Sequence, residues 1–373
     1  MTSAAAPEIN SRTTLNFSAG PGVLPESVLE QAAQDVLELD GTGISVLEHS
    51  HRSPSIDRVF EETESTCREV GNIPDDFEVL FLQGGASMQF AMLPMNLLSK
   101  GRTADYADTG SWTSKAIQDA RMVGDVHVAW SGKEGGYRSI PSQNEIIWSD
   151  HPAYACYCTN NTIYGTRWNT APSAPAPLVA DMSSDIFSRP IDWNAHAMVY
   201  AGAQKNIGPA GVTLAIIQRD LLEQCNRALP AMLRYDIHAT KGSRYNTPPV
   251  FAVYCAGLVF KWILRFGGLE AMSAHNDAKA DVIYNAIDQS GGFYRGHSDV
   301  DCRSTMNIPF TTPSTELDAA FIAESGTHDM HNLKGHRSVG GIRASVYNAF
   351  PVAGCQRLAE FMADFASRHH TGD

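Results

Sequence analysis

The stretch from Val199 to Ile217, VYAGAQKNIGPAGVTLAII, places one lysine, Lys205, between two apolar runs of strand length. The segment NIGPAG follows this lysine directly, so we expect it at a strand end, where open α/β sheets present functional groups. Apolar neighbours reduce the solvation of an amine, which lowers its pKa and favours the neutral form that makes a Schiff base. Lys205 is therefore a candidate nucleophile, and an exposed lysine in a turn is the alternative that this stretch leaves open.

Short apolar or β-branched runs alternate with helix-like segments on both sides of this stretch. Seven runs have strand length, and several are apolar on both faces, which is typical of a mainly parallel sheet covered by helices. These runs are residues 77–83, 104–110, 125–130, 154–159, 176–184, 197–203 and 212–218. The sequence therefore predicts an α/β fold.

The C-terminal third of the chain has a different pattern. A long apolar helix is predicted to end at Gly267-Gly268, a glycine pair typical of a helix C-terminus. An amphipathic helix follows, and two strand-like segments, RSTMNIPF and GIRASVYNA, flank another helical stretch. We expect a smaller α+β lobe here.

Charge excludes two classes of partner. The chain of 373 residues has 28 Lys and Arg against 41 Asp and Glu, a formal net charge of -13. Nucleic acids and anionic membranes favour clustered Lys and Arg, so we expect neither as a partner. The start, MTSAAAPEINSRTT, has no signal-peptide pattern, and no apolar run approaches the length of about eighteen residues that suggests a membrane helix. We expect a soluble cytoplasmic protein.

Cysteine and histidine spacing indicates no metal site. The seven cysteines are scattered and form no CxxC pair, which is typical of reduced thiols. Cys156 and Cys158 would share one face of a strand as small buried hydrophobes, with a metal or redox role as the alternative. His328 and His331 have no third ligand at metal spacing, so we expect ordinary solvated histidines.

Two further residues end strand-like runs. Asp181 ends an apolar run, where a carboxylate needs a partner or is strongly perturbed. Paired with a protonated pyridine nitrogen, it would strengthen that ring as an electron sink; a helix cap or a structural ion pair is the alternative. Trp112 lies where a strand gives way to a helix and can stack on a planar ring, unless it is only a buried aromatic plug.

The motif LQGGASMQF is a candidate phosphate site. Gly84-Gly85 follows a strand, and Ala86 and Ser87 open a helix. Free backbone N–H groups and the positive helix end can hold a phosphate there. The motif is neither GxGxxG nor a P-loop, so alone it is a weak signal.

Two segments supply candidate anion ligands. GHRSVGGIRAS contains His336, Arg337 and Arg343, and EHSHR contains His51 and Arg52. The planar guanidinium fork of arginine matches a carboxylate or a phosphate bidentately. Surface charges on a glycine-rich turn are the alternative.

Nine blocks together carry a family resemblance. In chain order they are NFSAGPGVLP, EHSHR, GGASMQF, ADYADTGSW, ADMSSDIFSRPID, YAGAQKNIGPAG, YNTPP, GLVFKW and GHRSVGGIRASVYNA, from Asn16 to Ala349. This set resembles the phosphoserine aminotransferase family. The resemblance implies a fold-type I enzyme with pyridoxal 5'-phosphate as cofactor, a mostly parallel seven-stranded sheet in the large domain, a small domain, and a homodimer with shared active sites. It also implies reversible transamination between L-glutamate and 3-phosphohydroxypyruvate, giving 2-oxoglutarate and O-phospho-L-serine.

The resemblance assigns roles around the cofactor. It implies that Lys205 bonds covalently to the cofactor and moves a proton, that Asp181 pairs with the pyridine nitrogen, and that Trp112 stacks on the ring. Thr162 matches the residue that bonds the ring hydroxyl. The matching phosphate ligands are Ala86, Ser87 and Gln204, with Asn246 and Thr247 from the partner subunit. This chain reads GGAS where some members read GGGR, so an arginine contact to the phosphate is not expected.

The resemblance also assigns the anion ligands. Arg343 would hold the α-carboxylate of the substrate. His336 and Arg337, with His51 and Arg52 from the partner subunit, would clasp the substrate phosphate. L-Glutamate and phosphorylated 2-oxo acids are thus the expected substrates, and 4-phosphohydroxy-L-threonine is a further one that some family members use.

We expect three segments: residues 1–22, packing with the small domain; residues 23–268, the large cofactor-binding domain; and residues 269–373, the small domain. A related enzyme, such as an alanine–glyoxylate aminotransferase or a cysteine desulfurase, is an alternative within the fold. The desulfurase needs a mobile cysteine in a C-terminal Gly/Ser-rich loop, and none of the seven cysteines has that context. A non-catalytic protein that binds a phosphorylated metabolite or a partner is the alternative of another class.

Overall fold

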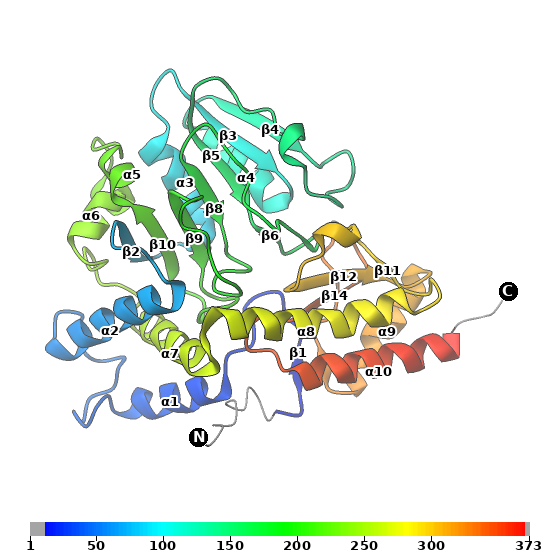
Figure 1. The fold of residues 1–373 in the computed structure, drawn as a ribbon. Coiled ribbons are helices and arrows are strands. Elements are labelled where there is room, and N and C mark those ends of the chain that lie inside the picture. The colour runs from blue at the N-terminus through cyan, green and yellow to red at the C-terminus, as the bar shows by residue number, and fades with distance from the viewer. Residues whose placement is uncertain (1–11, 370–373) are drawn as a thin grey trace.

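A seven-stranded sheet forms the centre of the larger part of the molecule (Figure 1). The computed structural model describes residues 12–369. The strand order is β2-β10-β9-β8-β5-β3-β4, and only β10 runs antiparallel to its neighbours. The strands are β2 (Phe77–Leu82), β3 (Thr103–Asp108), β4 (Val126–Ser131), β5 (Pro152–Cys158), β8 (Leu178–Asp181), β9 (Met198–Gly202) and β10 (Thr213–Gln218). All seven predicted strands are confirmed, and so is the mostly parallel sheet.

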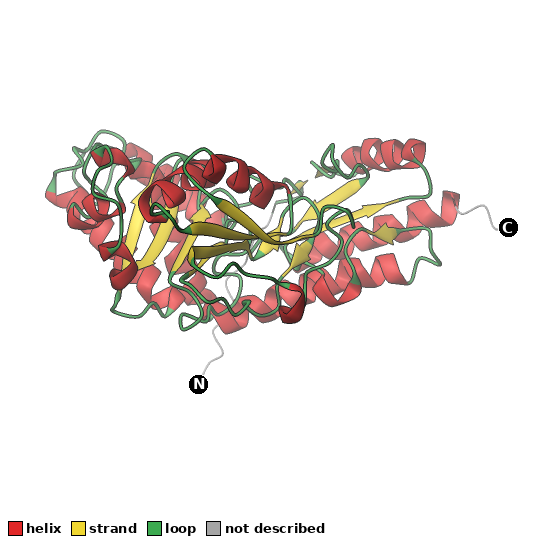
Figure 2. Ribbon diagram, turned by 90° about the horizontal axis from the view of Figure 1, so that it is seen from above, coloured by secondary structure: helices red, strands yellow, loops and turns green. Residues whose placement is uncertain are grey.

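Helices cover both faces of this sheet (Figure 2). One layer contains α1 (Glu26–Leu37), α2 (Pro54–Gly71) and α7 (Val250–Phe266), and the other contains α3 (Gly85–Leu97), α4 (Ser111–Arg121), α5 (Arg219–Glu223) and α6 (Tyr235–Thr240). Alternate residues of β5 enter opposite layers: Ala155 and Tyr157 join the cluster with α7, and Tyr154 and Cys156 join the cluster with α3. Burial on both faces explains why these strands are apolar throughout.

The long apolar helix ends at the predicted glycine pair. Gly267 caps α7 with a φ of 112°, a left-handed conformation that glycine adopts without strain. The amphipathic helix α8 (Gly268–Asp288) follows. Among the described residues, no single helix is long and apolar enough to cross a membrane. The helices α7 and α8 have enough length and apolar character only when taken together, and the chain bends by 84° between them.

A second, smaller sheet lies beside the C-terminal helices. It contains β11 (Arg295–Gly296), β12 (Asn307–Thr311) and β14 (Ile342–Ser345), packed with α8, α9 (Thr315–Thr327) and α10 (Val352–His369). The short strand β1 (Leu15–Asn16) pairs in parallel with β13 (Met330–His331). Leu15 and Phe17 pack into the hydrophobic cluster of this part. The domain limits at residues 22 and 268 stay a prediction, and residues 1–11 of the first segment lie outside the described residues.

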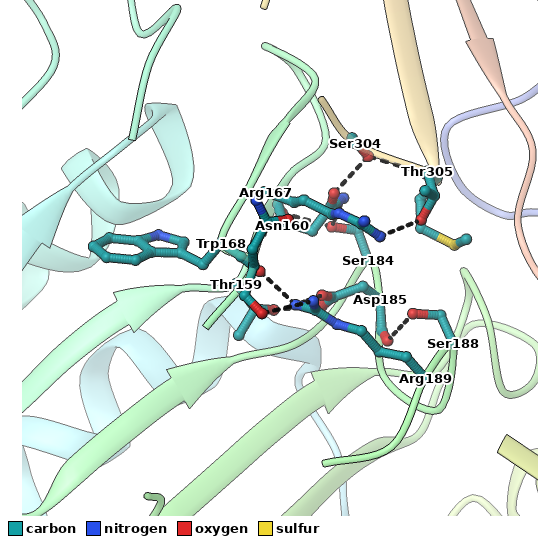
Figure 3. Close-up of polar contacts among 12 residues, drawn as sticks. Thr159, Asn160, Arg167, Trp168, Ser184, Asp185, Ser188, Arg189, Ser304 and Thr305 are labelled. Carbon is teal, nitrogen blue, oxygen red and sulfur yellow. Dashed lines mark hydrogen bonds and ion pairs between the residues drawn. The ribbon is translucent and has the colours of Figure 1, made fainter. Parts of the chain in front are cut away.

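A buried polar network joins segments that follow strands of the large sheet to the smaller sheet (Figure 3). Asn160 lies in the short hairpin of β6 (Asn160–Asn161) and β7 (Thr166–Arg167) that follows β5. Its Nδ2 donates to Ser184 Oγ at 2.8 Å and to Asn307 Oδ1 at 2.9 Å, and its Oδ1 accepts from Ser304 Oγ. The segment that ends at Thr162 is therefore fixed between the two parts of the chain.

All seven cysteines are free and buried. Burial raises the pKa of every one of these thiols, to about 11 for Cys255 and Cys302 and to about 12 for Cys225 and Cys355. Cys156 and Cys158 lie on the same face of β5, as predicted for small buried hydrophobes. Within residues 12–369, no group of three or more His, Cys, Asp or Glu side chains is arranged to hold a metal ion.

Candidate active site

The predicted functional residues gather at one edge of the large sheet. Because β10 is antiparallel to both β2 and β9, the strands β2, β9, β8, β5 and β3 all run in the same direction. Their carboxyl ends therefore meet at one edge, the usual ligand site of open α/β sheets. The segments that leave this edge carry residues 83–87, 109–112, 159–162, 181 and 203–205.

Lys205 is buried in the turn that follows β9. Only 8% of its surface is exposed, and its Nζ donates a hydrogen bond of 2.8 Å to Thr162 Oγ1. Desolvation lowers the pKa of this amine, and the negative charge of Asp181 opposes that shift only in part. The expected pKa shift of a lysine between apolar strands is confirmed in its direction, and it favours the neutral amine.

An N-terminal segment braces this turn. The Gly22 N–H donates to the Gln204 carbonyl at 2.7 Å. A side chain at Gly22 would place its Cβ 2.8 Å from the Lys205 carbonyl oxygen, closer than packing allows. The SAGPG segment, residues 18–22, contributed to the family resemblance, but this contact was not predicted from it. Its two glycines were the feature of the sequence that could have indicated a close backbone approach.

Asp181 ends β8 with 6% of its surface exposed. Burial raises the pKa of its carboxyl, while the Ser183 N–H, which donates to Oδ1 at 2.9 Å, and the Lys205 charge lower it. Because burial is the largest of these effects, the carboxylate lacks a full counter-charge within the chain. A cation at the Asp181 carboxylate would therefore be stabilised.

Trp112 lies in the first turn of α4, above the strand ends. Its ring centroid is 6.0 Å from Lys205 Nζ and 4.3 Å from Lys115 Nζ. Its indole Nε1 is buried without a hydrogen-bond partner. Buried indole N–H groups usually find a partner, so this donor is available to a ligand.

Arg343 lies in β14 of the smaller sheet and reaches Thr162 from there. Its Nη1 donates to the Thr162 carbonyl oxygen at 3.3 Å, and its Nε is buried without a partner. Desolvation lowers the pKa of this guanidinium. Desolvation and then the charges of Arg343 and Arg337 lower the pKa of His336, so the predicted anion ligands of this segment form one cluster. An anion at this cluster would relieve the mutual repulsion of these groups.

The helix α3 begins directly after the strand β2. Gly84 has a φ of 87° and is followed by Gly85, Ala86 and Ser87 without a side-chain cap. The first backbone N–H groups of α3 are thus free of a capping side chain and can bind an anion. Asn246 of the same chain donates to Gln83 Oε1 at 2.8 Å, beside this helix start.

His51 and Arg52 lie apart from this cluster within one chain. They precede α2, whose N-cap is Ser53. Among the described residues, neither side chain forms a hydrogen bond or an ion pair with Lys205, Asp181 or Arg343. The assignment of His51, Arg52, Asn246 and Thr247 to a partner subunit's site therefore stays a prediction.

Residues 14–358 match the model of the aminotransferase class-V family. The chain belongs to the class-V aminotransferase family. It is 50% identical over 357 residues to phosphoserine aminotransferase of Herpetosiphon aurantiacus, covering 95% of this chain and 99% of that relative. It is also similar to the structure of phosphoserine aminotransferase from Bacillus circulans subsp. alkalophilus, with a TM-score of 0.94, 48% identity, and coverage of 96% and 99%. A pyridoxal-phosphate-bound phosphoserine aminotransferase from Trichomonas vaginalis matches with a TM-score of 0.90, 37% identity, and coverage of 94% and 99%.

The site of this aminotransferase fits pyridoxal 5'-phosphate. Asp181 is a buried carboxylate without a full counter-charge, which suits a protonated pyridine nitrogen. Lys205 is an amine of lowered pKa, which suits an aldehyde, and α3 has an uncapped N-terminus, which suits a phosphate. The unpartnered Trp112 Nε1 supplies a further donor beside Lys205.

Proposed function

We propose that this aminotransferase is a phosphoserine aminotransferase. It exchanges an amino group reversibly between L-glutamate and 3-phosphohydroxypyruvate, giving 2-oxoglutarate and O-phospho-L-serine on the route to L-serine. The observation that carries this proposal is the convergence of Lys205 and Arg343 on Thr162, which brings an amine to its side chain and a guanidinium to its backbone carbonyl. The names of the relatives that share about half of its residues support the same reaction.

Seven residues of one chain would hold pyridoxal phosphate. Lys205 would bind its aldehyde, Asp181 would pair with its ring nitrogen, and Trp112 would stack on its ring. Thr162 would bond the ring hydroxyl, and Ala86, Ser87 and Gln204 would hold the phosphate. Bound there, the cofactor supplies an electron sink for the electron pair left when the substrate α-carbon loses its proton.

The residues of the chain position the substrate and move that proton. Arg343 binds the α-carboxylate with a planar, charge-assisted fork, which orients the α-carbon. The Lys205 amine, whose lowered pKa favours the neutral form, accepts the α-proton and returns it. Its hydrogen bond to Thr162 holds Nζ in place.

We propose a homodimer in which each site borrows residues from the partner subunit. His51 and Arg52 would join His336 and Arg337 around the substrate phosphate, and Asn246 and Thr247 would join the cofactor phosphate. Two exposed apolar side chains in the segment that precedes residues 51–52 support an interface: Leu37 is 80% exposed and Leu47 is 58% exposed. The seven free thiols support a location in the reducing cytoplasm.

The decisive experiment compares two amino donors. O-phospho-L-serine and L-serine are added separately, at one low concentration, to the purified protein loaded with pyridoxal phosphate, and the visible absorbance of the cofactor is recorded. Bleaching by phosphoserine alone is the expected result. Equal bleaching by both donors would contradict the phosphate clasp, and no absorbance band after loading would contradict the cofactor assignment. Pyruvate and glyoxylate are also tested as amino acceptors. Activity with either that equals or exceeds the activity with 3-phosphohydroxypyruvate would favour a related aminotransferase instead.

A further inference from the structure

An additional cation lies beside the site. Lys115 is on α4, one turn after Trp112, and its Nζ is 4.3 Å from the indole centroid. Since Lys205 Nζ is 6.0 Å from the same centroid, the two amines are no more than about 10 Å apart. Within residues 12–369, the Lys115 side chain forms no hydrogen bond or ion pair, and its ammonium lies over the indole of Trp112. A cation held over an aromatic ring is ordered but keeps its charge.

Lys115 also belongs to the electrostatic neighbourhood of the anion cluster. Its charge adds to those of Arg343 and Arg337 in lowering the pKa of His336. Lys115 comes from the α4 layer of the large sheet, whereas the other three residues come from β14 and the loop before it. The positive charges that act on His336 therefore come from two different parts of the chain.

The loop that carries His336 is closed on itself. The Gly335 N–H donates to the Gly341 carbonyl at 2.9 Å, and the Gly340 N–H donates to the His336 carbonyl at 2.8 Å. Asp108, the last residue of β3, accepts hydrogen bonds from Ser114 and Ser131, and within residues 12–369 it forms no ion pair with Lys115. The charge of Lys115 on α4 and the charges of Arg337 and Arg343 thus all act on His336 in this loop.

We propose that Lys115 is a specificity-determining residue that adds a positive charge for the phosphate of the substrate. The inference rests on the proposed function and deepens it. A phosphate monoester carries a charge of about -1.5 to -2 at neutral pH, whereas the side-chain carboxylate of glutamate carries only one negative charge. An additional cation that has no ion-pair partner therefore stabilises the bound phosphorylated substrate more than it stabilises bound glutamate. Arg343 does not discriminate in this way, because both substrates have an α-carboxylate.

The test uses the full chain loaded with pyridoxal phosphate. Lys115→Met removes the charge and keeps most of the apolar stem, Lys115→Arg keeps the charge, and Lys100→Met is the matched control on an exposed lysine before β3. For each protein, kcat/KM is measured separately for the half-reactions with O-phospho-L-serine and with L-glutamate. We expect Lys115→Met to lower kcat/KM for phosphoserine about tenfold and for glutamate about twofold or less, the size typical of one charge-assisted contact.

Each outcome separates the two proposals. If the wild-type protein does not prefer phosphoserine to serine, the proposed function fails before the variants are compared. If the wild-type protein has that preference and Lys115→Met lowers both half-reactions equally, Lys115 acts only by holding Trp112, and the specificity role is wrong. An unchanged Lys115→Met enzyme would also overturn it. We expect Lys115→Arg to keep the preference for phosphoserine. We also expect the cofactor absorbance to be unchanged in all variants.

Discussion

Lys205 Nζ donates to the side chain of Thr162 at 2.8 Å, and the backbone of the same threonine accepts from Arg343. One residue thus sets the spacing between the amine and the guanidinium. Thr162 follows the hairpin strand of Asn160, which is bonded to Ser184 in the turn after β8 and to Asn307 in β12. The relative position of the amine and the guanidinium is therefore set by contacts within the chain.

Lys205→Ala is expected to reduce kcat at least about 1,000-fold, because it removes the group that bonds the cofactor and carries the α-proton. Single-turnover absorbance with phosphoserine measures the loss. Added methylamine should restore part of the rate, since a small amine can fit the space that the side chain leaves. Turnover within tenfold of the wild-type rate would contradict the role of this lysine.

Asp181→Asn is expected to bind pyridoxal phosphate yet to transaminate about 100-fold more slowly or worse. An amide is neutral and cannot stabilise a protonated pyridine nitrogen as a carboxylate does. Cofactor content is read from absorbance after gel filtration, and kcat from steady-state assays. A variant with full cofactor content and near-normal kcat would show that the electron-sink assignment is wrong.

Arg343→Lys keeps a positive charge but loses the planar fork. We expect kcat/KM to fall about 10- to 100-fold for glutamate and for phosphoserine alike, mainly through KM, because both carry an α-carboxylate. Parallel assays of the two half-reactions provide the comparison. A loss confined to the phosphorylated substrate would instead assign Arg343 to the phosphate.

Lys279 offers a test of pH-dependent stability. This lysine is fully buried in α8, and its Nζ donates to the carbonyls of Val346 at 2.8 Å and Tyr347 at 2.6 Å. Burial lowers its pKa in the folded protein to about 7, from 10.5. Between these two pH values the unfolded chain binds more protons than the folded chain. The free energy of unfolding therefore rises with pH across this window.

The measurement compares wild-type protein with Lys279→Met by urea unfolding at pH 7 and pH 9. The difference between their free energies of unfolding should shift in favour of wild type as pH rises, by at most about 1.4 kcal/mol per pH unit. Other titrating groups are common to both proteins and cancel. A difference that does not change between pH 7 and pH 9 would mean that Lys279 stays protonated when folded.

The local pattern of apolar residues was enough to predict the large sheet and the residues at its strand ends. The runs around Phe77 and Val199 are apolar on both faces, and Gly267 supplies the left-handed cap that ends α7. Strand limits were less accurate: the run 176–184 forms a strand only over Leu178–Asp181, because Pro177 precedes it and the chain turns after the aspartate.

Contacts between distant segments could not be predicted. The two-residue strands β1 and β13 are too short to show a period, and they pair over more than 300 residues of sequence. The bonds of Asn160 to Asn307 and of Gln83 to Asn246 also depend on tertiary packing. Lys115 was missed for the same reason, because nothing in the sequence sets α4 beside the loop of His336.

Because all seven thiols are buried, their chemical labelling reports local unfolding of the protein. Cys67 and Cys255 lie in the core with α7, Cys156 and Cys225 in the core with α3, and Cys355 in the core of the smaller part. A thiol-alkylating reagent meets none of them at the surface of the folded chain. Each alkyl group that becomes attached therefore records one excursion of a particular core into solvent, and mass spectrometry of the labelled peptides would time the cores separately.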